Sequence, residues 1–585
     1  MLREHSHGAN YSSSVHWAAV LDSISELIDH CEEKEKEKKP APHDTPMPSQ
    51  LPGPRLLYEP VKVTKTDILT SMPARPMVDR MVARYFNALG IAPAILHSAQ
   101  FLRQYESFWR DPVGTPFIWI GLLFSVICLA TQFQQPGEEL AEASSLMHIH
   151  QFHERIVQCL VLGQYTRGGP YVVETMINYC ASELCITKDT DVGPWLPLGI
   201  MVPLAVSQGY HRDPAGFPNI SPFVGEMRRR VWAAVVQMDL RLSNQMGLPH
   251  LLKSTQCNTA EPRNLFDCDF DEDTVELPPS RPETEITPVL YSLAKNRIDK
   301  IGGPISDMAA DARGCPYTDI MALDRQLQEV ETSLPTIFRW QPLSQSFMVP
   351  PQVLMFRIWL RLAVLRLVIW LHRKYLAPSY SDARYEYSRS ACARASMEIL
   401  EFQVLLNDET RAGGQLHQTR WMQSSLMHST FLLGMSVACY YMQLTRTALP
   451  EEAPNLEMRS RIRDLLRDTY PLWLRCSAGS RDAREAAERL RQLPDLQGHL
   501  MEVEGQVAGQ EAPLSAVPAY WDIFHQGTGR HHALDAALIA QAQLGAAADS
   551  DVGLGPVSNG PSAFGGNLAW DGEGFSFHGQ HGDDR

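Results

Sequence analysis

The segment from Trp195 to Pro249 constrains the fold more than any other stretch, because two helix-period patterns flank a loop rich in proline and glycine. In the first pattern, apolar residues recur every three or four positions, which predicts a helix with one buried face. These residues are Leu198, Val202, Ala205 and Val206. Gly209 follows them and predicts the end of that helix, because glycine adopts a positive φ without steric cost.

The second pattern predicts a helix that begins at Ser221 and Pro222. A serine side chain accepts from the unpaired N–H groups of the first turn, and a proline at the first helical position needs no donor. Glu226 lies near the positive end of that helix's dipole. Helical spacing places one apolar face inward, and this face consists of Val231, Val235, Met238 and Leu242.

Three consecutive arginines, Arg228–Arg230, lie within the second helix. Successive helical residues point about 100° apart, so the three side chains cannot form one flat cationic surface. We expect them to pair with acids such as Glu226 and Asp239 and to hold neighbouring helices together. Contact with nucleic-acid phosphates is the alternative, for which a short basic run is weak evidence.

Two further apolar runs are predicted as buried helices rather than membrane spans. The run from Phe117 to Thr131 is too short to cross a bilayer. The run from Val353 to Leu371 carries three arginines, which are costly at the centre of a bilayer; they are Arg357, Arg361 and Arg366. We expect this helix to be enclosed by others, with its arginines paired or extended to water.

Net charge and cysteine spacing bear on two kinds of function, namely nucleic-acid binding and metal binding. The formal net charge is −15, the wrong sign for a protein whose whole surface binds nucleic acid. The 11 cysteines are dispersed and include no Cys-x2-Cys pair, whereas structural zinc sites use short ligand spacings. Dispersed thiols fit a reducing compartment. We therefore expect no metal site and no cofactor in this chain.

Two other clusters resemble metal sites at first sight. His148, His150 and His153 do not share one helix face, so a three-ligand site is not expected. The acidic stretch Asp267–Asp273 lacks the central glycine and terminal glutamate of a calcium loop, and we expect a structural, solvated loop. Phosphate-loop, dinucleotide-binding, nucleophile-elbow and zinc-protease motifs are absent, so no catalytic residues are predicted.

Taken together, the segment resembles the fungal-specific transcription factor domain, the middle homology region of Zn2Cys6 binuclear zinc cluster transcription factors. The resemblance covers roughly residues 60–445. It implies an all-α helical bundle or array, a regulatory role in transcription of a metabolic or biosynthetic gene set, and a nuclear location. The matching residues, to which we assign a structural role, are Trp195, Gly209, His211, Arg212, Asp213, Glu226, Arg228, Arg229, Arg230, Trp232, Asp239, Ser243, Gly247 and Pro249.

The chain departs from the family at its start. Family activators usually begin with six closely spaced cysteines that bind two zinc ions and place a helix in the DNA major groove. No such module is present here, so either it was lost or the start codon is assigned too far downstream. The resemblance therefore implies DNA binding only indirectly or through a missing N-terminal module, and zinc only if that module exists.

Composition divides the chain into four segments. Residues 1–39 are expected to form a linker with a short amphipathic helix, and proline-rich residues 40–56 a second linker. Residues 57–525 are expected to form the all-α body. Residues 526–585 are expected to be a disordered tail rich in glycine and acids, either an activation segment or inert.

Two functional hypotheses remain open. In the first, the chain is a transcription regulator that acts as a homodimer, through a DNA-binding partner protein, or under the control of a small-molecule effector, without membrane association. The alternative is a non-DNA-binding all-α ligand-binding or enzymatic protein derived from the same family. The missing zinc cluster favours the alternative, and the lack of a catalytic constellation counts against it.

Overall fold

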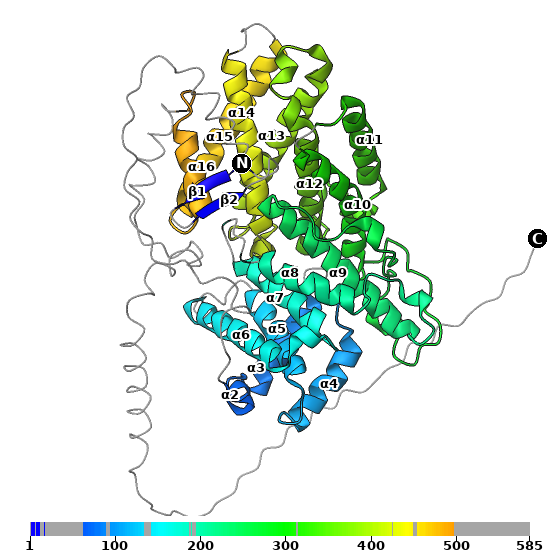
Figure 1. Cartoon of the computed structure of the whole chain (residues 1–585). Helices are drawn as coiled ribbons and strands as arrows, with labels where there is room; N and C mark the ends of the chain where they lie inside the picture. Colours follow the sequence, from blue (N-terminus) through cyan, green and yellow to red (C-terminus); the bar gives the residue numbers. More distant parts are fainter. Residues whose placement is uncertain are drawn as a thin grey trace, which may run out of the picture. The chain divides into compact units, whose positions relative to one another are not determined.

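The computed structural model describes residues 2–5, 8–11, 17, 63–88, 94–133, 142–186, 189, 193, 195–311, 314–423, 425–447 and 453–496. All of them belong to the unit Met1–His525. Strands β1 (Leu2–His5) and β2 (Gly8–Tyr11) form an antiparallel pair. The sequence does not predict this pair, because neither strand alternates apolar and polar residues. Every other regular element of the described ranges is a helix, so the all-α prediction is confirmed (Figure 1).

The first set of helices surrounds one hydrophobic core. It consists of α2 (Lys65–Thr70), α3 (Arg75–Asn87), α4 (Ser98–Arg110), α5 (Phe117–Gln132), α6 (Glu142–Leu162), α7 (Val172–Ile186), α8 (Trp195–Ser207) and α9 (Pro222–Met246). Helix α5 packs against α3, α6 and α7, and α8 packs against α7 and α9 (Figure 1).

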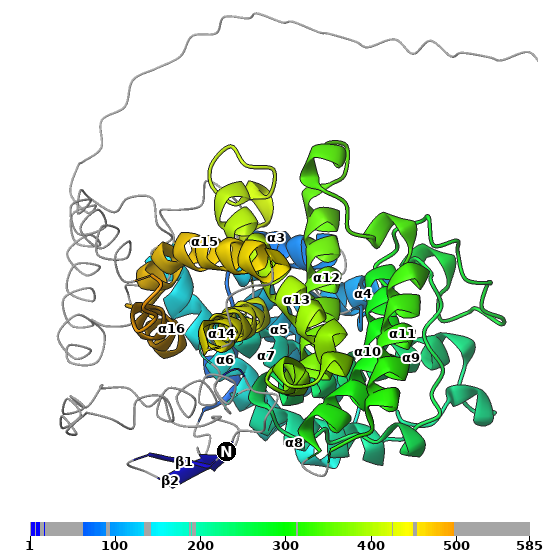
Figure 2. The same ribbon diagram turned by 90° about the horizontal axis from the view of Figure 1, so that it is seen from above.

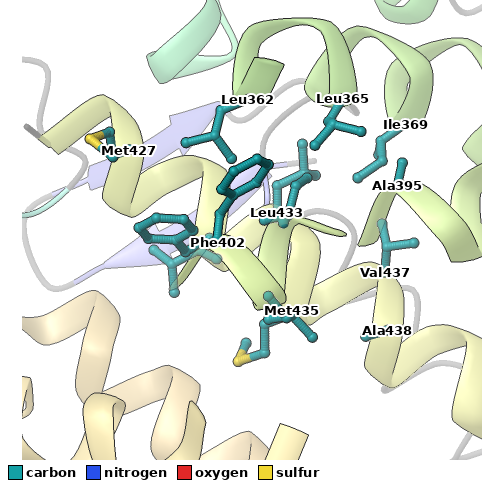
Figure 3. Packing of buried hydrophobic residues seen from close by; sticks show 14 of the residues in the cluster. Leu362, Leu365, Ile369, Ala395, Phe402, Met427, Leu433, Met435, Val437 and Ala438 are labelled. Atoms are coloured by element: carbon teal, nitrogen blue, oxygen red, sulfur yellow. The ribbon is translucent and has the colours of Figure 1, made fainter. Parts of the chain in front are cut away.

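The second set surrounds another core. It consists of α10 (Leu290–Ala310), α11 (Tyr317–Ser333), α12 (Pro351–His372), α13 (Glu386–Glu409), α14 (Ser425–Thr447), α15 (Ala453–Cys476) and α16 (Arg481–Arg491). Figure 2 shows α12, α13 and α14 side by side. Their facing side chains fill the space between them in Figure 3, among them Leu362, Ile369, Ala395, Phe402, Leu433 and Val437.

Short 3-10 helices connect the longer elements. They are η3 (Tyr165–Arg167), η4 (Pro214–Gly216), η5 (Ser254–Gln256), η6 (Asp267–Asp269), η7 (Thr336–Phe338), η8 (Leu343–Gln345), η9 (Arg373–Tyr375), η10 (Pro378–Tyr380), η11 (Ala383–Tyr385) and η12 (His417–Met422). Two of them, η4 and η6, lie in the loops that contact α9, as described below.

Helix α5 is apolar on every side because other helices cover it, and its residues from 119 to 132 are all buried. Gly121 allows α6 to approach closely, since a Cβ at this position would lie 2.8 Å from the Cβ of Cys159. The prediction of a buried core helix is confirmed. Among the described helices, none combines the length and apolarity that a membrane crossing requires.

Two of the three arginines of α12 are paired as expected. Arg357 donates to the carbonyl oxygen of Ile337 at 2.7 Å. Arg361 forms an ion pair with Glu398 of α13 at 2.6 Å. Arg366, on the opposite face, lines a cavity that is considered below. Helix α12 is thus enclosed by other helices, as its charge pattern predicts.

Helix α9 belongs to both cores. Its residues Trp232 and Leu242 pack into the first core, and the helix also contacts α10 and α14 of the second. On the same helix, Asn244 accepts a 2.6 Å hydrogen bond from the Ser306 hydroxyl of α10. The helix predicted from Ser221 onward therefore connects the two halves of the body.

The aromatic side chains Phe101, Tyr105 and Phe108 of α4 are buried in the first core, and α4 ends at Arg110, directly before Asp111-Pro112. Only 2–5, 8–11 and 17 of residues 1–39 are described. The predicted amphipathic helix, the linker at 40–56 and the tail at 526–585 lie outside the described residues and stay predictions.

Candidate regulatory core around helix α9

The first helix of the family segment ends at Gly209 as predicted, and the second also ends at a glycine. At the end of α8, Gly209 has a φ of 75°, and the N–H of Tyr210 donates to the carbonyl oxygen of Ala205 at 3.0 Å. At the end of α9, Gly247 has a φ of 63°, and the N–H of Leu248 donates back to Ser243 at 2.8 Å. These bonds satisfy terminal carbonyls and turn the chain sharply.

The start of α9 also follows the prediction. The N–H of Val224 donates to the hydroxyl of Ser221 at 3.3 Å, and Pro222 occupies the first turn. The predicted inward face is buried; it consists of Val231, Val235, Met238 and Leu242. This anchored helix positions the three arginines.

Arg228 holds the end of α8. Its Nη2 donates to the carbonyl oxygen of Gln208 at 2.6 Å, and its guanidinium lies 4.2 Å from the centre of the Tyr210 ring. A cation over an aromatic face is attracted by the ring's quadrupole. Arg228 therefore fastens α9 to the turn that follows α8.

Arg229 holds the loop between α8 and α9. Its Nε and Nη2 donate to both carboxylate oxygens of Asp213, at 3.1 and 2.8 Å. Asp213 also accepts from the backbone N–H groups of Ala215 and Ala260. The hydrogen bond from Arg229 is the main cause that lowers the pKa of Asp213 to about 2. This carboxylate joins two loops to one helix.

Arg230 is buried, with 1% of its side chain exposed, and faces two acids. Its Nη1 contacts Asp267 at 2.7 Å, and its Nε lies 3.6 Å from the fully buried Glu226. Burial raises the pKa of Glu226, which Arg230 partly opposes. Burial alone would also raise the pKa of Asp267, but the charge of Arg230 brings it below its ordinary value.

The expectation that Asp239 pairs with these arginines is wrong. Asp239 instead accepts from the backbone N–H groups of Leu251 and Leu252, at 3.1 and 2.8 Å, and from the Ser243 hydroxyl at 3.2 Å. Trp195 donates in turn to Ser243 at 3.2 Å. Asp239 lies more than two turns beyond Arg230, so it faces the loop after α9 and satisfies N–H groups there.

The arginines also hold loops rather than neighbouring helices. We call Arg228, Arg229 and Arg230, with their acceptors Gln208, Asp213, Glu226 and Asp267, the arginine brace. Three of these acceptors lie on loops or turns, and the fourth, Glu226, lies on α9 itself. Because the guanidinium groups already donate to acceptors within the protein, the triplet is not available to DNA phosphates.

The remaining motif residues occupy the edge of this site. The His211 ring lies 6.3 Å from that of Trp232, which is buried. His211 also accepts, through its backbone oxygen, from the N–H of Asn258 at 3.1 Å. Arg212 and Pro249 are exposed. The brace therefore contains five of the motif residues, and the others, including these two, lie outside it.

The acidic loop is exposed at Asp271, Glu272 and Asp273, as predicted, but its first residue, Asp267, belongs to the brace. Asp267 accepts from the N–H of Ser98 at 2.8 Å in addition to Arg230. Asp269 pairs with Arg281 at 2.6 Å, and 12% of its side chain is exposed. The structural part of the prediction agrees with the structure, whereas the expected solvation is wrong for both residues. Composition alone does not reveal cations so distant in sequence.

The histidine cluster near residue 150 does not form a metal site. The Nε2 of His153 lies 2.5 Å from the Ser182 hydroxyl, and its Nδ1 lies 3.0 Å from Glu183. Burial lowers the pKa of His153, but Cys128 and Glu183 raise it, to about 10. His148 instead stacks on Phe152. Within the described ranges, no group of three or more acidic, histidine or cysteine side chains is placed to hold a metal.

The sequence did not reveal this Ser–His–Glu contact, because its members are nearly thirty residues apart. A serine beside a histidine is the arrangement of an activated nucleophile. Here Ser182 is fully buried and donates its proton to the carbonyl oxygen of Tyr179 at 2.8 Å. The hydroxyl is therefore occupied and has no path to a substrate, so the contact is a core hydrogen-bond network.

The comparisons with known proteins agree with this geometry. A family model described as the fungal specific transcription factor domain matches residues 82–301. That range contains most of the first core, the whole arginine brace and the first part of α10.

Curated relatives extend the similarity over most of the chain. Transcription factor cghF of Chaetomium globosum is 72% identical, over 92% of this chain and 97% of that protein. The pyrrolocin cluster transcription factor fsdR of Fungal sp. is 45% identical over 83% of this chain and 65% of that protein. The Zn(2)-C6 fungal-type transcription factor pigI of Monascus ruber is 41% identical over 82% and 60%. The chain thus spans about two thirds or less of the length of fsdR and of pigI.

Proposed function

The chain belongs to the family of fungal transcription factors that carry the fungal-specific transcription factor domain, and on that premise we propose that it regulates one biosynthetic gene cluster in a fungal nucleus. The observation that carries this proposal is the similarity to cghF, which extends over nearly the whole length of that transcription factor. The names of other relatives refer to biosynthetic gene clusters, such as the pyrrolocin and equisetin clusters.

Within this function the described body is the regulatory part. The arginine triplet donates its hydrogen bonds to acceptors within the protein, which supports DNA contact through a separate module or a partner protein. Among the described residues, no group of three or more His, Cys, Asp or Glu side chains is placed to hold a metal ion, which supports a regulatory body that works without zinc. The chain acts by binding rather than catalysis, a view that the buried and occupied Ser182 supports.

Deleting the gene in its host and sequencing the RNA tests the proposal. We expect the transcripts of one contiguous biosynthetic cluster to change together and to recover when the full chain is restored. A fluorescently tagged chain should be enriched in the nucleus. Unchanged cluster transcripts, or a tagged protein confined to the cytosol, would contradict the proposal.

A matched pair of alleles tests the brace in the same host. Arg230→Gln leaves Glu226 and Asp267 without their cation, so we expect lower protein abundance and a weaker transcript response. Arg325→Gln changes an exposed arginine of α11 and should behave as the wild type. Equal responses from the two alleles would show that the brace is not needed for regulation.

A further inference from the structure

A cavity of about 50 Å³ lies where α9, α10, α12 and α14 meet. Its lining contains three cations, namely Arg241 of α9, Lys295 of α10 and Arg366 of α12. It contains one carboxylate, that of Asp299. These side chains therefore carry two more positive charges than negative ones.

Only one of the three cations has a carboxylate partner within the described residues. The Nζ of Lys295 contacts Asp299, one helical turn away, at 2.5 Å. The Nε atoms of Arg241 and Arg366 are buried and have no hydrogen-bond acceptor there. The Arg366 guanidinium lies 5.2 Å from the centre of the Trp370 ring. On both of these partly exposed side chains, one buried N–H group thus lacks an acceptor.

These N–H groups without acceptors carry a cost that an additional anion would relieve. A buried polar group is tolerated when it is hydrogen-bonded, and it destabilises the fold otherwise. Burial lowers the pKa of Arg366 to about 10 and also lowers that of Lys295, which Asp299 opposes. Arg366 therefore stays charged at neutral pH, and the cost is not relieved by loss of its proton.

We propose that this cavity binds the carboxylate of a small organic acid, which pairs with Arg241 and Arg366. A guanidinium presents parallel N–H donors that match the two oxygens of a carboxylate. The volume exceeds what one water needs and is of the order of a small anionic head group.

The rest of the lining fits an apolar body attached to that carboxylate. Tyr291 and Trp359 contribute aromatic rings, and Leu362 and Met427 contribute apolar surface. Leu362 and Met427 also belong to the second core, as Figure 3 shows. A ligand here would contact α9, which joins the two cores, together with three helices of the second core. This binding goes beyond the proposed function and can be measured without DNA.

Thermal unfolding of the purified full chain tests the site with propionate and its neutral analogue propionamide, at constant ionic strength. A ligand that binds only the folded state raises Tm in a saturable way. We expect propionate to raise Tm by about 2 °C or more at saturation, and propionamide and chloride to have no such effect. An equal response to all three, or no saturable rise, would overturn the proposal.

Substitutions on two different helices locate the response. Arg366→Met and Arg241→Met should each abolish the shift caused by propionate. They should leave the Tm of the ligand-free chain unchanged or higher, because each removes a buried N–H group that lacks an acceptor. Arg325→Met, at an exposed position of α11, is the matched control and should keep the full shift.

The two cavity variants are independent of one another, so failure of one to fold leaves the other informative. Retention of the propionate shift in either folded variant would place the binding elsewhere. A clear fall in the Tm of both ligand-free variants would show that these arginines are satisfied within the fold, which also contradicts the proposal.

Discussion

Individual acidic residues around α9 mainly accept hydrogen bonds from backbone N–H groups and from arginine side chains. Asp213 accepts from Arg229 and from two N–H groups of separate loops. Asp239 accepts from the N–H groups of Leu251 and Leu252. A carboxylate has more acceptor sites than any one cation uses, so one residue can hold a loop and a helix together.

Asp213→Asn tests this role. The substitution keeps the size of the side chain but removes its charge, and we expect the free energy of unfolding to fall by about 1–3 kcal/mol at neutral pH. The pKa of Asp213 is lowered to about 2 in the folded chain, from an ordinary value of 3.8. Its stabilisation is therefore present above pH 3.8 and is lost as the pH falls towards 2.

Urea unfolding at pH 7 and at pH 3 measures both effects. The difference between wild type and Asp213→Asn should shrink at the lower pH. Asp408→Asn, in an exposed ion pair with Arg411, is the control and should cost less than about 1 kcal/mol. A difference for Asp213→Asn that does not depend on pH would refute the assignment.

Helices α8 and α9 end in the same way, with a glycine at positive φ and a backbone hydrogen bond that closes the turn. The end of α8 places Gln208 and Tyr210 against Arg228. The end of α9 leads into the segment whose N–H groups contact Asp239. Gly209 and Gly247 thus set the direction of the loops after α8 and α9. The arginine brace and Asp239 then hold these loops in place.

Gly209→Ala measures the importance of that turn. A Cβ at Gly209 would have ordinary contacts, its nearest neighbour being the Nη2 of Arg228 at 3.5 Å, so the cost comes from the positive φ of 75°. We expect the free energy of unfolding to fall by about 1–2 kcal/mol.

Gly303→Ala is the matched control, because this glycine lies inside α10 at an ordinary φ with open space around its Cβ position. There alanine should be neutral or stabilising by about 1 kcal/mol. Similar effects of the two substitutions on chemical denaturation would show that backbone conformation is not the cause.

On the scale of the whole body, two hydrophobic cores share a few contacts. Trp421 of η12 packs on Phe133, next to the end of α5, with ring centres 4.7 Å apart, and the hydroxyl of Ser306 bonds to Asn244. Trp340 and Phe402 form a pair with the same 4.7 Å separation, but entirely within the second core.

Comparing Trp421→Ala with Trp340→Ala distinguishes the coupling between the two cores from the overall stability of the chain. Both should lower Tm, because each removes an aromatic contact of about 0.5–1.5 kcal/mol beyond its buried area. Only Trp421→Ala should make calorimetric unfolding broader or split it into two transitions, since it weakens the joint between the cores. Splitting in both variants, or in neither, would contradict this picture.

Helices and their ends could be predicted from the sequence because their causes are local. Apolar spacing indicates α5, α8, α9 and α12, Ser221 indicates where α9 begins, and Gly209 indicates where α8 ends. Pairing could not be predicted in the same way. Asp239 was assigned to an arginine within reach in the sequence, whereas its partners are N–H groups of the following loop.

By itself, the sequence determined that the chain is helical, that its two apolar runs are buried, and where α8 ends and α9 begins. Periodicity and helix capping act over a few residues, so these features are local. The tertiary structure alone decided which charges meet. It brought Asp267 to Arg230, and it placed Arg241 and Arg366 at one cavity without a carboxylate partner among the described residues. Such contacts depend on how distant helices pack, and no local pattern encodes that packing.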